Sequence, residues 1–263
     1  MEKLLRAALQ ATTGPQKHKY LEYNPLNRDD FKLKKVSSKD EREIEFFEID
    51  EQKILLAEAR KYAGGQSFGG MTDLRWFMRP FLALKLGLRS GEITGLQWGD
   101  IDWVKKEVKI SRAVHYARGD TKPEIKDTKT GKPRTLGLSE PVIKELKKYR
   151  TWVNEILLKF RGRLKDTDHI LFSDEFGILH ESAPMSRWKT VLRRAGLKYR
   201  GFHSLRHTYV ANLISLNINL KHVQERLGHS SITTTMDTYG KILDKDKNEI
   251  DRKIEQWDMQ MDA

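Results

Sequence analysis

Apolar positions early in the chain recur with the spacing of helices that bury one face. Asp50 is a residue type that caps helices, and Gly64-Gly65 is a typical helix end. We therefore predict a helix from Asp50 to about Ala63. Its apolar positions are Ile54, Leu55, Leu56 and Ala59.

The next segment, residues 72–86, is apolar on almost every side, which predicts a buried helix. Pro80 lies inside it, so we expect either a kink at this residue or a helix that begins there. Ser90 is then expected to cap a short helix that carries Ile93 and Leu96.

From Trp98 the period changes from helical to alternating. Residues 108–111 alternate apolar and polar side chains, and segments 124–129 and 134–138 flank a Thr-Gly-Lys-Pro turn at 130–133. We predict a three-stranded antiparallel sheet within residues 106–138.

After Ser139 the pattern is helical again, and Ser139 with Pro141 should start a long helix to about Phe160. Further helices are predicted at 183–195, 204–216, 219–227, 231–240 and 244–260. The fold class is therefore α+β, mainly helical with one small three-stranded antiparallel sheet.

The N-terminal part has another character. Residues 1–10 resemble a short amphipathic helix, but residues 1–26 offer it no partner, and residues 27–45 are a charged linker. We predict the main domain at 46–243 and a C-terminal helix or tail at 244–263. The apolar stripe of that last helix packs either on its own domain or on a neighbouring protomer.

Charge and composition narrow the function. The net charge of +12 favours a polyanionic partner, nucleic acid above all, over a merely soluble basic protein. The chain has no cysteine, which excludes a disulfide scaffold, thiolate zinc sites and cysteine nucleophiles, and fits a reducing cytoplasm. We find no bilayer-spanning apolar run and no signal peptide.

A few residues could carry chemistry together. His203 and Arg206 are one helical turn apart, His229 lies at a Leu-Gly-His corner, and Tyr239 and Arg89 complete the set. Each alone is ordinary: a solvated arginine, a capping histidine, a core tyrosine. A phenol is a poor nucleophile unless cations favour its anion. Two guanidiniums and two imidazoles around one phosphate would supply that field, which suits breaking a DNA strand through a tyrosine-phosphate bond.

These motifs resemble those of the tyrosine recombinases, the phage integrase family. The matching boxes are Gly87-Leu88-Arg89-Ser90-Gly91-Glu92, the His203–His207 box, Leu227-Gly228-His229, and Tyr239. Trp98-Gly99-Asp100-Ile101-Asp102 also matches the segment after the first box. The resemblance covers about residues 46–245, with the boxes in the family's order.

The resemblance implies the following roles. Arg89 and Arg206 would bind the non-bridging oxygens of the scissile phosphate and stabilise the transition state. His229 would donate a further hydrogen bond, and His203 would accept the tyrosine proton or position the phosphate. Tyr239 would attack phosphorus to give a 3′-phosphotyrosyl bond and a free 5′-hydroxyl, with strand exchange through a Holliday junction.

Other residues would support or complete this set. Glu92 and His207 are expected to orient the groups that touch the phosphate. The family's general acid is a lysine on a turn between strands, and Lys129 aligns best, with Lys126 and Lys132 as near neighbours. The reaction needs neither metal nor ATP, and the sequence has no P-loop, paired-carboxylate or zinc-ligand pattern.

The resemblance also implies partners. They are double-stranded DNA carrying recombination sites, three further copies in a homo-tetramer on DNA with a monomer expected alone, and an accessory directionality factor. We expect a cytoplasmic, nucleoid-associated protein. The family's core-binding domain is represented at most by its last helix, in residues 1–26, so we expect a fragment or a truncated product with weak DNA binding.

Two other readings stay open on the sequence. A type IB topoisomerase shares the residue types but acts without sequence specificity, and a DNA-binding regulator could have lost catalysis. The Leu-Gly-His-Ser-Ser corner favours the recombinase over the topoisomerase, and the complete residue set argues against the regulator.

Overall fold

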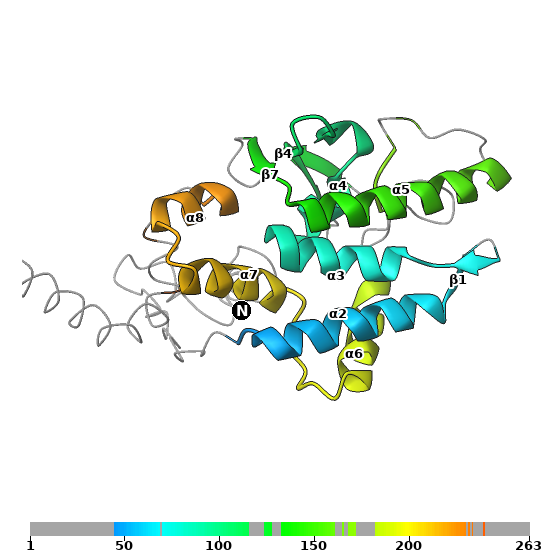
Figure 1. Ribbon diagram of the computed structural model, residues 1–263, viewed down its shortest axis with the longest axis horizontal. Helices are drawn as coiled ribbons and strands as arrows, with labels where there is room; N and C mark the ends of the chain where they lie inside the picture. Colours follow the sequence, from blue (N-terminus) through cyan, green and yellow to red (C-terminus); the bar gives the residue numbers. More distant parts are fainter. Residues whose placement is uncertain are drawn as a thin grey trace, which may run out of the picture. The chain divides into compact units, whose positions relative to one another are not determined.

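Two helices build the middle of the fold, in a computed structural model that describes residues 45–68, 70–115, 124–127, 133–160, 165, 168–171, 182–229, 231, 233 and 239. They are α2 (Ile49–Gly64) and α3 (Arg75–Leu86), joined by the short strands β1 (Ser67–Phe68) and β2 (Met71–Thr72). In Figure 1, α3 lies between α2 on one side and α4 and α5 on the other. The prediction that α3 is buried is correct, because all its residues except Lys85 are buried.

The start of α3 corrects one expectation. The helix begins at Arg75 and runs through Pro80, so the proline does not mark its start. The buried carboxylate of Asp73 accepts bonds from the backbone N–H of Arg75 at 3.2 Å, from Arg75 Nε at 2.8 Å and from Trp76 Nε1 at 2.8 Å. Asp73 supports the helix start, because one of these donors, the backbone N–H of Arg75, is a group that the first turn leaves unpaired.

Besides the β1–β2 pair, the described strands form two small sheets rather than the single predicted one. The first is antiparallel, in the order β3-β4-β7, and the second pairs β5 with β6. Their bounds are β3 Ile101–Asp102, β4 Glu107–Ile110, β5 Arg112–His115, β6 Glu124–Asp127 and β7 Arg134–Gly137. A three-stranded antiparallel sheet is present, as predicted, but the segment at 124–127 belongs to the other sheet.

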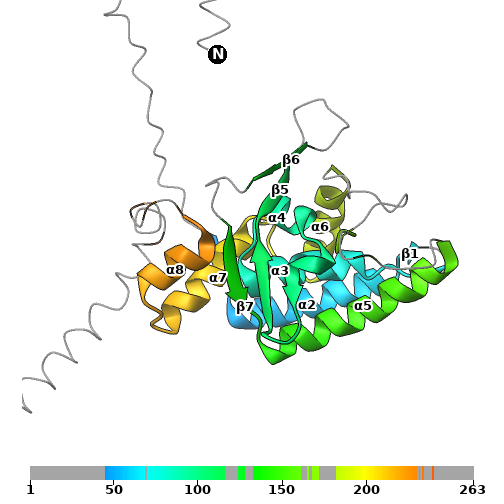
Figure 2. The same ribbon diagram turned by 90° about the horizontal axis from the view of Figure 1, so that it is seen from above.

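The physical reason lies in where apolar side chains face. Val108 pairs with Leu136 in register, and both are buried, which fixes β4 against β7. All four residues of β6 are exposed, so this strand has no buried face, and among the described strands it pairs with β5 alone. Figure 2 shows the β5–β6 hairpin projecting from the body of the domain.

The remaining elements are helical, in agreement with the sequence pattern. Short segments α4 (Ser90–Gly95) and η2 (Trp98–Asp100) precede the sheets. The later helices are α5 Glu140–Phe160, α6 Ser182–Arg194, α7 Ser204–Ser215 and α8 Leu220–Leu227. The predicted mainly helical fold with a small antiparallel sheet is therefore confirmed.

The elements pack so that distant sequence segments become neighbours. Helix α3 packs on α2 and α7, α8 contacts α7 and β7, and α4 packs on β5. Both views show α7 and α8 side by side, next to β7 (Figures 1 and 2). The first turns of α4 and α7 and the end of α8 thus come together.

Some predictions fall outside the described residues. They are the helices at 1–10 and 244–260, the linker at 27–45 apart from Glu45, and most of the helix at 231–240. Among the helices that the structure describes, none has the length and apolar character needed to cross a membrane.

Candidate active site

The first part of the site is built where α3 ends and α4 begins. Gly87 adopts a left-handed conformation (φ 65°) as the C-cap of α3, and a Cβ there would lie 2.3 Å from Cδ1 of Tyr209. The chain can therefore turn tightly against α7 only with glycine. This turn places Arg89 at the N-cap of α4, with Glu92 in the first turn. Ser90, predicted as the cap, is the first helical residue instead.

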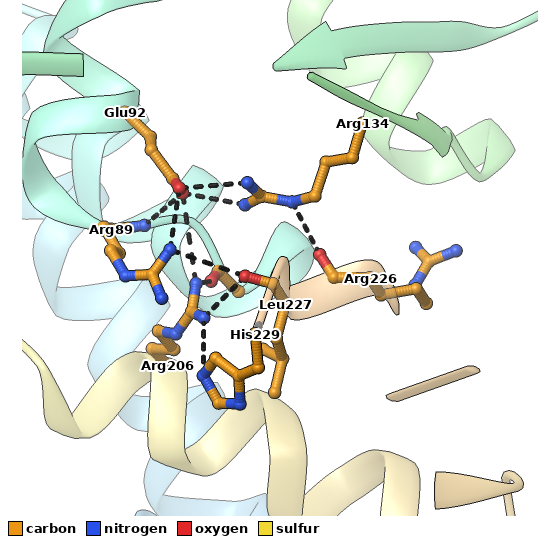
Figure 3. Close-up of polar contacts among 8 residues, drawn as sticks. Arg89, Glu92, Arg134, Arg206, Arg226, Leu227 and His229 are labelled. Carbon is orange, nitrogen blue, oxygen red and sulfur yellow. Dashed lines mark hydrogen bonds and ion pairs between the residues drawn. The ribbon is translucent and has the colours of Figure 1, made fainter. Parts of the chain in front are cut away.

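Glu92 is the centre of the polar cluster drawn in Figure 3. Its carboxylate accepts bonds from the backbone N–H of Arg89 at 2.9 Å and from Arg89 Nη1 at 3.0 Å. Arg134 donates Nη1 and Nη2 to the two carboxylate oxygens at 2.9 and 2.8 Å, and Arg206 Nη1 lies 3.9 Å away. Burial would raise the pKa of Glu92, but these bonds and charges, those of Arg134 first, lower it to about 2.

The second part of the site is the end of α8. Gly228 (φ 63°) is the left-handed C-cap, and the last carbonyls of the helix point toward the arginines. Arg206 donates Nη1 to the carbonyl of Gly87 at 2.7 Å and Nη2 to that of Leu227 at 2.8 Å. Arg89 Nη1 lies 3.5 Å from the same Leu227 oxygen. The guanidiniums therefore satisfy carbonyls that a helix end leaves unpaired.

His229 leaves this turn and joins the arginines. Its Nε2 lies 3.1 Å from Arg206 Nη2 (Figure 3). Burial first, and then the charges of Arg206 and Arg89, lower the pKa of His229 to about 4. The imidazole is therefore neutral at physiological pH. Burial also lowers the pKa of Arg206 to about 9, so its guanidinium stays protonated.

The third part lies on the first turn of α7. His203 precedes the helix, His207 is one turn on, and their rings are 4.8 Å apart, edge to face. Burial first, and then the charges of His207 and Arg206, lower the pKa of His203 to about 4. Burial and the charge of Arg206 also lower the pKa of His207. Both imidazoles are neutral at pH 7.

Tyr239 approaches this pair. Its hydroxyl lies 2.7 Å from His207 Nδ1, and the residue is 2 % exposed. Burial raises the pKa of Tyr239 to about 12, although the charges of Arg206 and Arg89 act in the opposite direction. In this state the phenol is protonated and held by a neutral histidine.

The structure thus brings together seven of the eight residues singled out from the sequence. Arg89, Glu92, Arg206 and His229 share one hydrogen-bonded cluster. His207 and Tyr239 share a second, and the ring of His203 lies edge to face with that of His207. The eighth, Lys129, lies outside the described residues, as does Lys132. Lys126 is described: it is exposed on β6 and pairs with Glu124 at 2.8 Å.

One member of the cluster was missed from the sequence. Arg134 begins β7, and its alternating neighbours Leu136 and Leu138 are buried, so its side chain shares the core-facing side of the strand. An arginine at such a position was the available signal. The described residues contain no group of three or more His, Asp or Glu side chains with the geometry of a metal site.

The sequence is similar to proteins of a known family. Residues 51–245 match the model of the phage integrase family. A tyrosine recombinase XerC-like protein of Caldanaerobacter subterraneus subsp. tengcongensis is 36% identical over 178 residues, which are 63% of this chain and 45% of that protein. The ICEBs1 integrase of Bacillus subtilis is 27% identical over 177 residues, 66% of this chain and 47% of the relative. The chain thus spans less than half the length of these curated relatives.

Solved structures share the fold. The Tn1549 transposon integrase in complex with transposon right end DNA superimposes with a TM-score of 0.63 at 18% identity, covering 90% of this chain and 72% of that one. The XerA recombinase gives a TM-score of 0.57 at 20% identity, covering 78% and 64%. The family match covers most of the chain and includes both clusters, so this chain belongs to the phage integrase family.

Proposed function

We propose that this chain carries the strand-cleaving centre of a site-specific DNA recombinase, formed by a catalytic domain at residues 46–243. The observation that supports this most is the convergence of Arg89, Arg206 and His229 at the end of α8, with the hydroxyl of Tyr239 held on the adjoining face of α7. This is a concentration of positive charge and donors beside a potential nucleophile, as transfer of a phosphodiester requires.

The proposed reaction forms one bond and breaks one. The Tyr239 oxygen attacks phosphorus, and the bond from phosphorus to the 5′-oxygen breaks, which leaves a 3′-phosphotyrosine and a 5′-hydroxyl. Arg89 and Arg206 stabilise the charge on the non-bridging oxygens, and His229 donates to one of them. Lys129 supplies the proton for the 5′-oxygen. The phosphoester conserves the bond energy, so neither ATP nor a metal ion takes part.

The phenolic proton needs an acceptor. His207 is the nearest described group, since its Nδ1 already lies 2.7 Å from the hydroxyl and burial lowers its pKa. His203, whose ring lies against that of His207, positions the phosphate or accepts the proton onward. This gives His207 a more direct role than the sequence suggested.

The proposed partner is double-stranded DNA with a recombination site. The net charge of +12 supports a polyanionic partner, and the Tn1549 neighbour was solved on DNA. A homo-tetramer would exchange strands of two duplexes through a Holliday junction, with a directionality factor choosing the outcome. The protein would work in the cytoplasm, at the nucleoid.

The test is covalent trapping. The 263-residue chain is incubated with a pool of duplexes that carry a nick near a randomised central sequence, and adducts are resolved on a denaturing gel. Wild type and Tyr199→Phe, at an exposed tyrosine, should form an adduct, and Tyr239→Phe should not.

Sequencing the trapped DNA gives the specificity. One enriched sequence supports a site-specific recombinase, whereas adducts on every sequence would indicate a topoisomerase activity. An adduct that persists in Tyr239→Phe would refute the proposed nucleophile.

A further inference from the structure

Arg134 reaches the cluster from a different element than the other arginines. It begins β7, pairs in register with Ile110 of β4, and its side chain is 9% exposed. All three guanidinium nitrogens have a partner: Nη1 and Nη2 bind the Glu92 carboxylate, and Nε binds the carbonyl of Arg226 at 2.8 Å (Figure 3). The sheet therefore connects with both α4 and α8 through this one side chain.

The first of these contacts determines which arginine pairs with the Glu92 carboxylate. A carboxylate that is 1% exposed must be paired, and three arginines surround this one. Arg134 takes both oxygens in the bidentate geometry that fixes a carboxylate most firmly. Without it, Glu92 would turn to Arg89 and Arg206 and compete with a phosphate for their N–H groups.

The second contact concerns the turn that presents His229. Arg134 binds the carbonyl of Arg226, while Arg206 binds that of Leu227, the next residue. Gly228 lies against the same guanidinium, because a Cβ at this position would be 3.0 Å from Arg134 Nη1. Arg134 thus fills the space under the turn and holds its backbone.

We propose that Arg134 is a positioning residue for the phosphate site: it holds Glu92 away from the phosphate-binding arginines and fixes the α8 turn that carries His229. The proposal rests on the proposed function, since it assigns to Arg134 a part in the same reaction. Arg134 itself would touch neither the phosphate nor Tyr239.

The experiment compares Arg134→Gln, Arg134→Lys and the double variant Arg134→Gln/Glu92→Gln with wild type. Lysine keeps the charge but cannot bind two oxygens and a carbonyl in one plane. Arg200→Lys is the matched control, because Arg200 Nη1 binds both oxygens of Glu51 at 2.9 Å in another part of the domain. We would measure three quantities for each protein: the single-turnover cleavage rate constant, the DNA affinity and the thermal unfolding temperature. The cleavage substrate is the DNA sequence enriched by trapping, at saturating concentration.

Arg134→Gln should reduce the cleavage rate constant by about 10- to 100-fold, the usual effect of removing a group that orients a reacting one, while DNA affinity stays within about twofold. Arg134→Lys should reduce the cleavage rate constant by less than Arg134→Gln does. If Arg134→Gln does not fold, the lysine variant still allows the measurement. The double variant should cleave faster than Arg134→Gln, because the competing charge is gone. A purely structural role would not produce this recovery.

Other results would overturn the proposal. One is a folded Arg134→Gln or Arg134→Lys variant that cleaves at the wild-type rate. Another is a double variant that cleaves more slowly than Arg134→Gln. A third is a fall in the cleavage rate constant no larger than that of Arg200→Lys. If wild type forms no adduct, the proposed function fails. A crystal structure of Arg134→Gln then tests separately whether Arg134 holds Glu92 and the turn with His229 in place. Glu92 should move onto Arg206; an unmoved Glu92 and His229 would refute it.

Discussion

Replacing Glu92 by glutamine removes a buried negative charge that three arginines surround. The side chain is 1% exposed, and its two oxygens receive bonds from Arg89 and Arg134, with Arg206 3.9 Å away. Glutamine keeps the volume but presents one acceptor where two were paired, and leaves the guanidiniums without a counter-charge. We therefore expect the folded state to lose stability although the shape of the core is kept.

The size of the loss follows from the pKa of Glu92. It is about 2 in the folded protein, against 4.5 ordinarily. Each pKa unit corresponds to ~1.4 kcal/mol, so ionised Glu92 stabilises the fold by about 3 kcal/mol at pH 7. This lies at the lower end of the ~3–5 kcal/mol measured when a buried pair is broken. For a domain of this size the melting temperature should fall by roughly 6 to 12 °C.

The loss should depend on pH in a defined direction. Because the folded-state pKa is depressed, the contribution is complete above about pH 4.5 and disappears as the pH falls through about 2. The difference between wild type and Glu92→Gln should therefore shrink from about 3 kcal/mol at pH 7 to about 1 kcal/mol at pH 3. Only below about pH 2 is wild-type Glu92 mostly protonated in the folded state, and there it resembles the variant.

Urea unfolding at pH 7, 5, 4 and 3 measures both quantities. Glu51→Gln is the control, since Glu51 also pairs with an arginine but its side chain is 26% exposed; its loss should stay below about 1 kcal/mol. A Glu92→Gln loss under about 1 kcal/mol at pH 7, or one that does not change with pH, would refute the account of Glu92 as a paired buried anion.

Two further predictions concern the turn and the nucleophile. Gly87→Ala should destabilise the fold by more than about 1 kcal/mol in thermal unfolding, because the residue has φ 65° and its Cβ would lie 2.3 Å from Tyr209; wild-type stability would contradict this. Burial lowers the pKa of His207 below the ordinary histidine value of 6.5. The yield of trapped adduct should therefore stay constant down to pH 6.5 and decline only at lower pH, as this histidine becomes protonated. A decline centred above pH 6.5 in pH-series trapping assays would exclude His207 as the acceptor.

Much of the fold was predictable because single segments carry their own signal. Helix α5 starts after Ser139 as the Ser and Pro there indicate, and the apolar residues of α3 are buried on all sides. The pairing between strands was harder to predict from the sequence. Segments 124–127 and 134–137 flank a turn composition, yet they lie in different sheets, since pairing depends on which face meets the core.

The site shows the same division. Motif spacing was sufficient to select Arg89, Arg206, His229 and Tyr239, which the fold brings into two adjoining clusters. Spacing could not show that His207, rather than His203, contacts the Tyr239 hydroxyl, because this contact joins side chains 32 residues apart and depends on tertiary packing. The assignment of Lys129 stays a prediction.

The cluster around Glu92 also has a consequence for how the protein is made. Its members come from α4, β7, α7 and α8, spread from Arg89 to His229, and the guanidiniums of Arg134 and Arg206 bind groups on other elements. A ribosome delivers these elements one after another, with α8 last. Arg89 and Glu92 therefore emerge long before Arg206 and the Leu227 carbonyl that Arg206 binds. A chain still being synthesised would have no assembled centre, so the proposed cleavage of DNA would begin only after these elements had folded together.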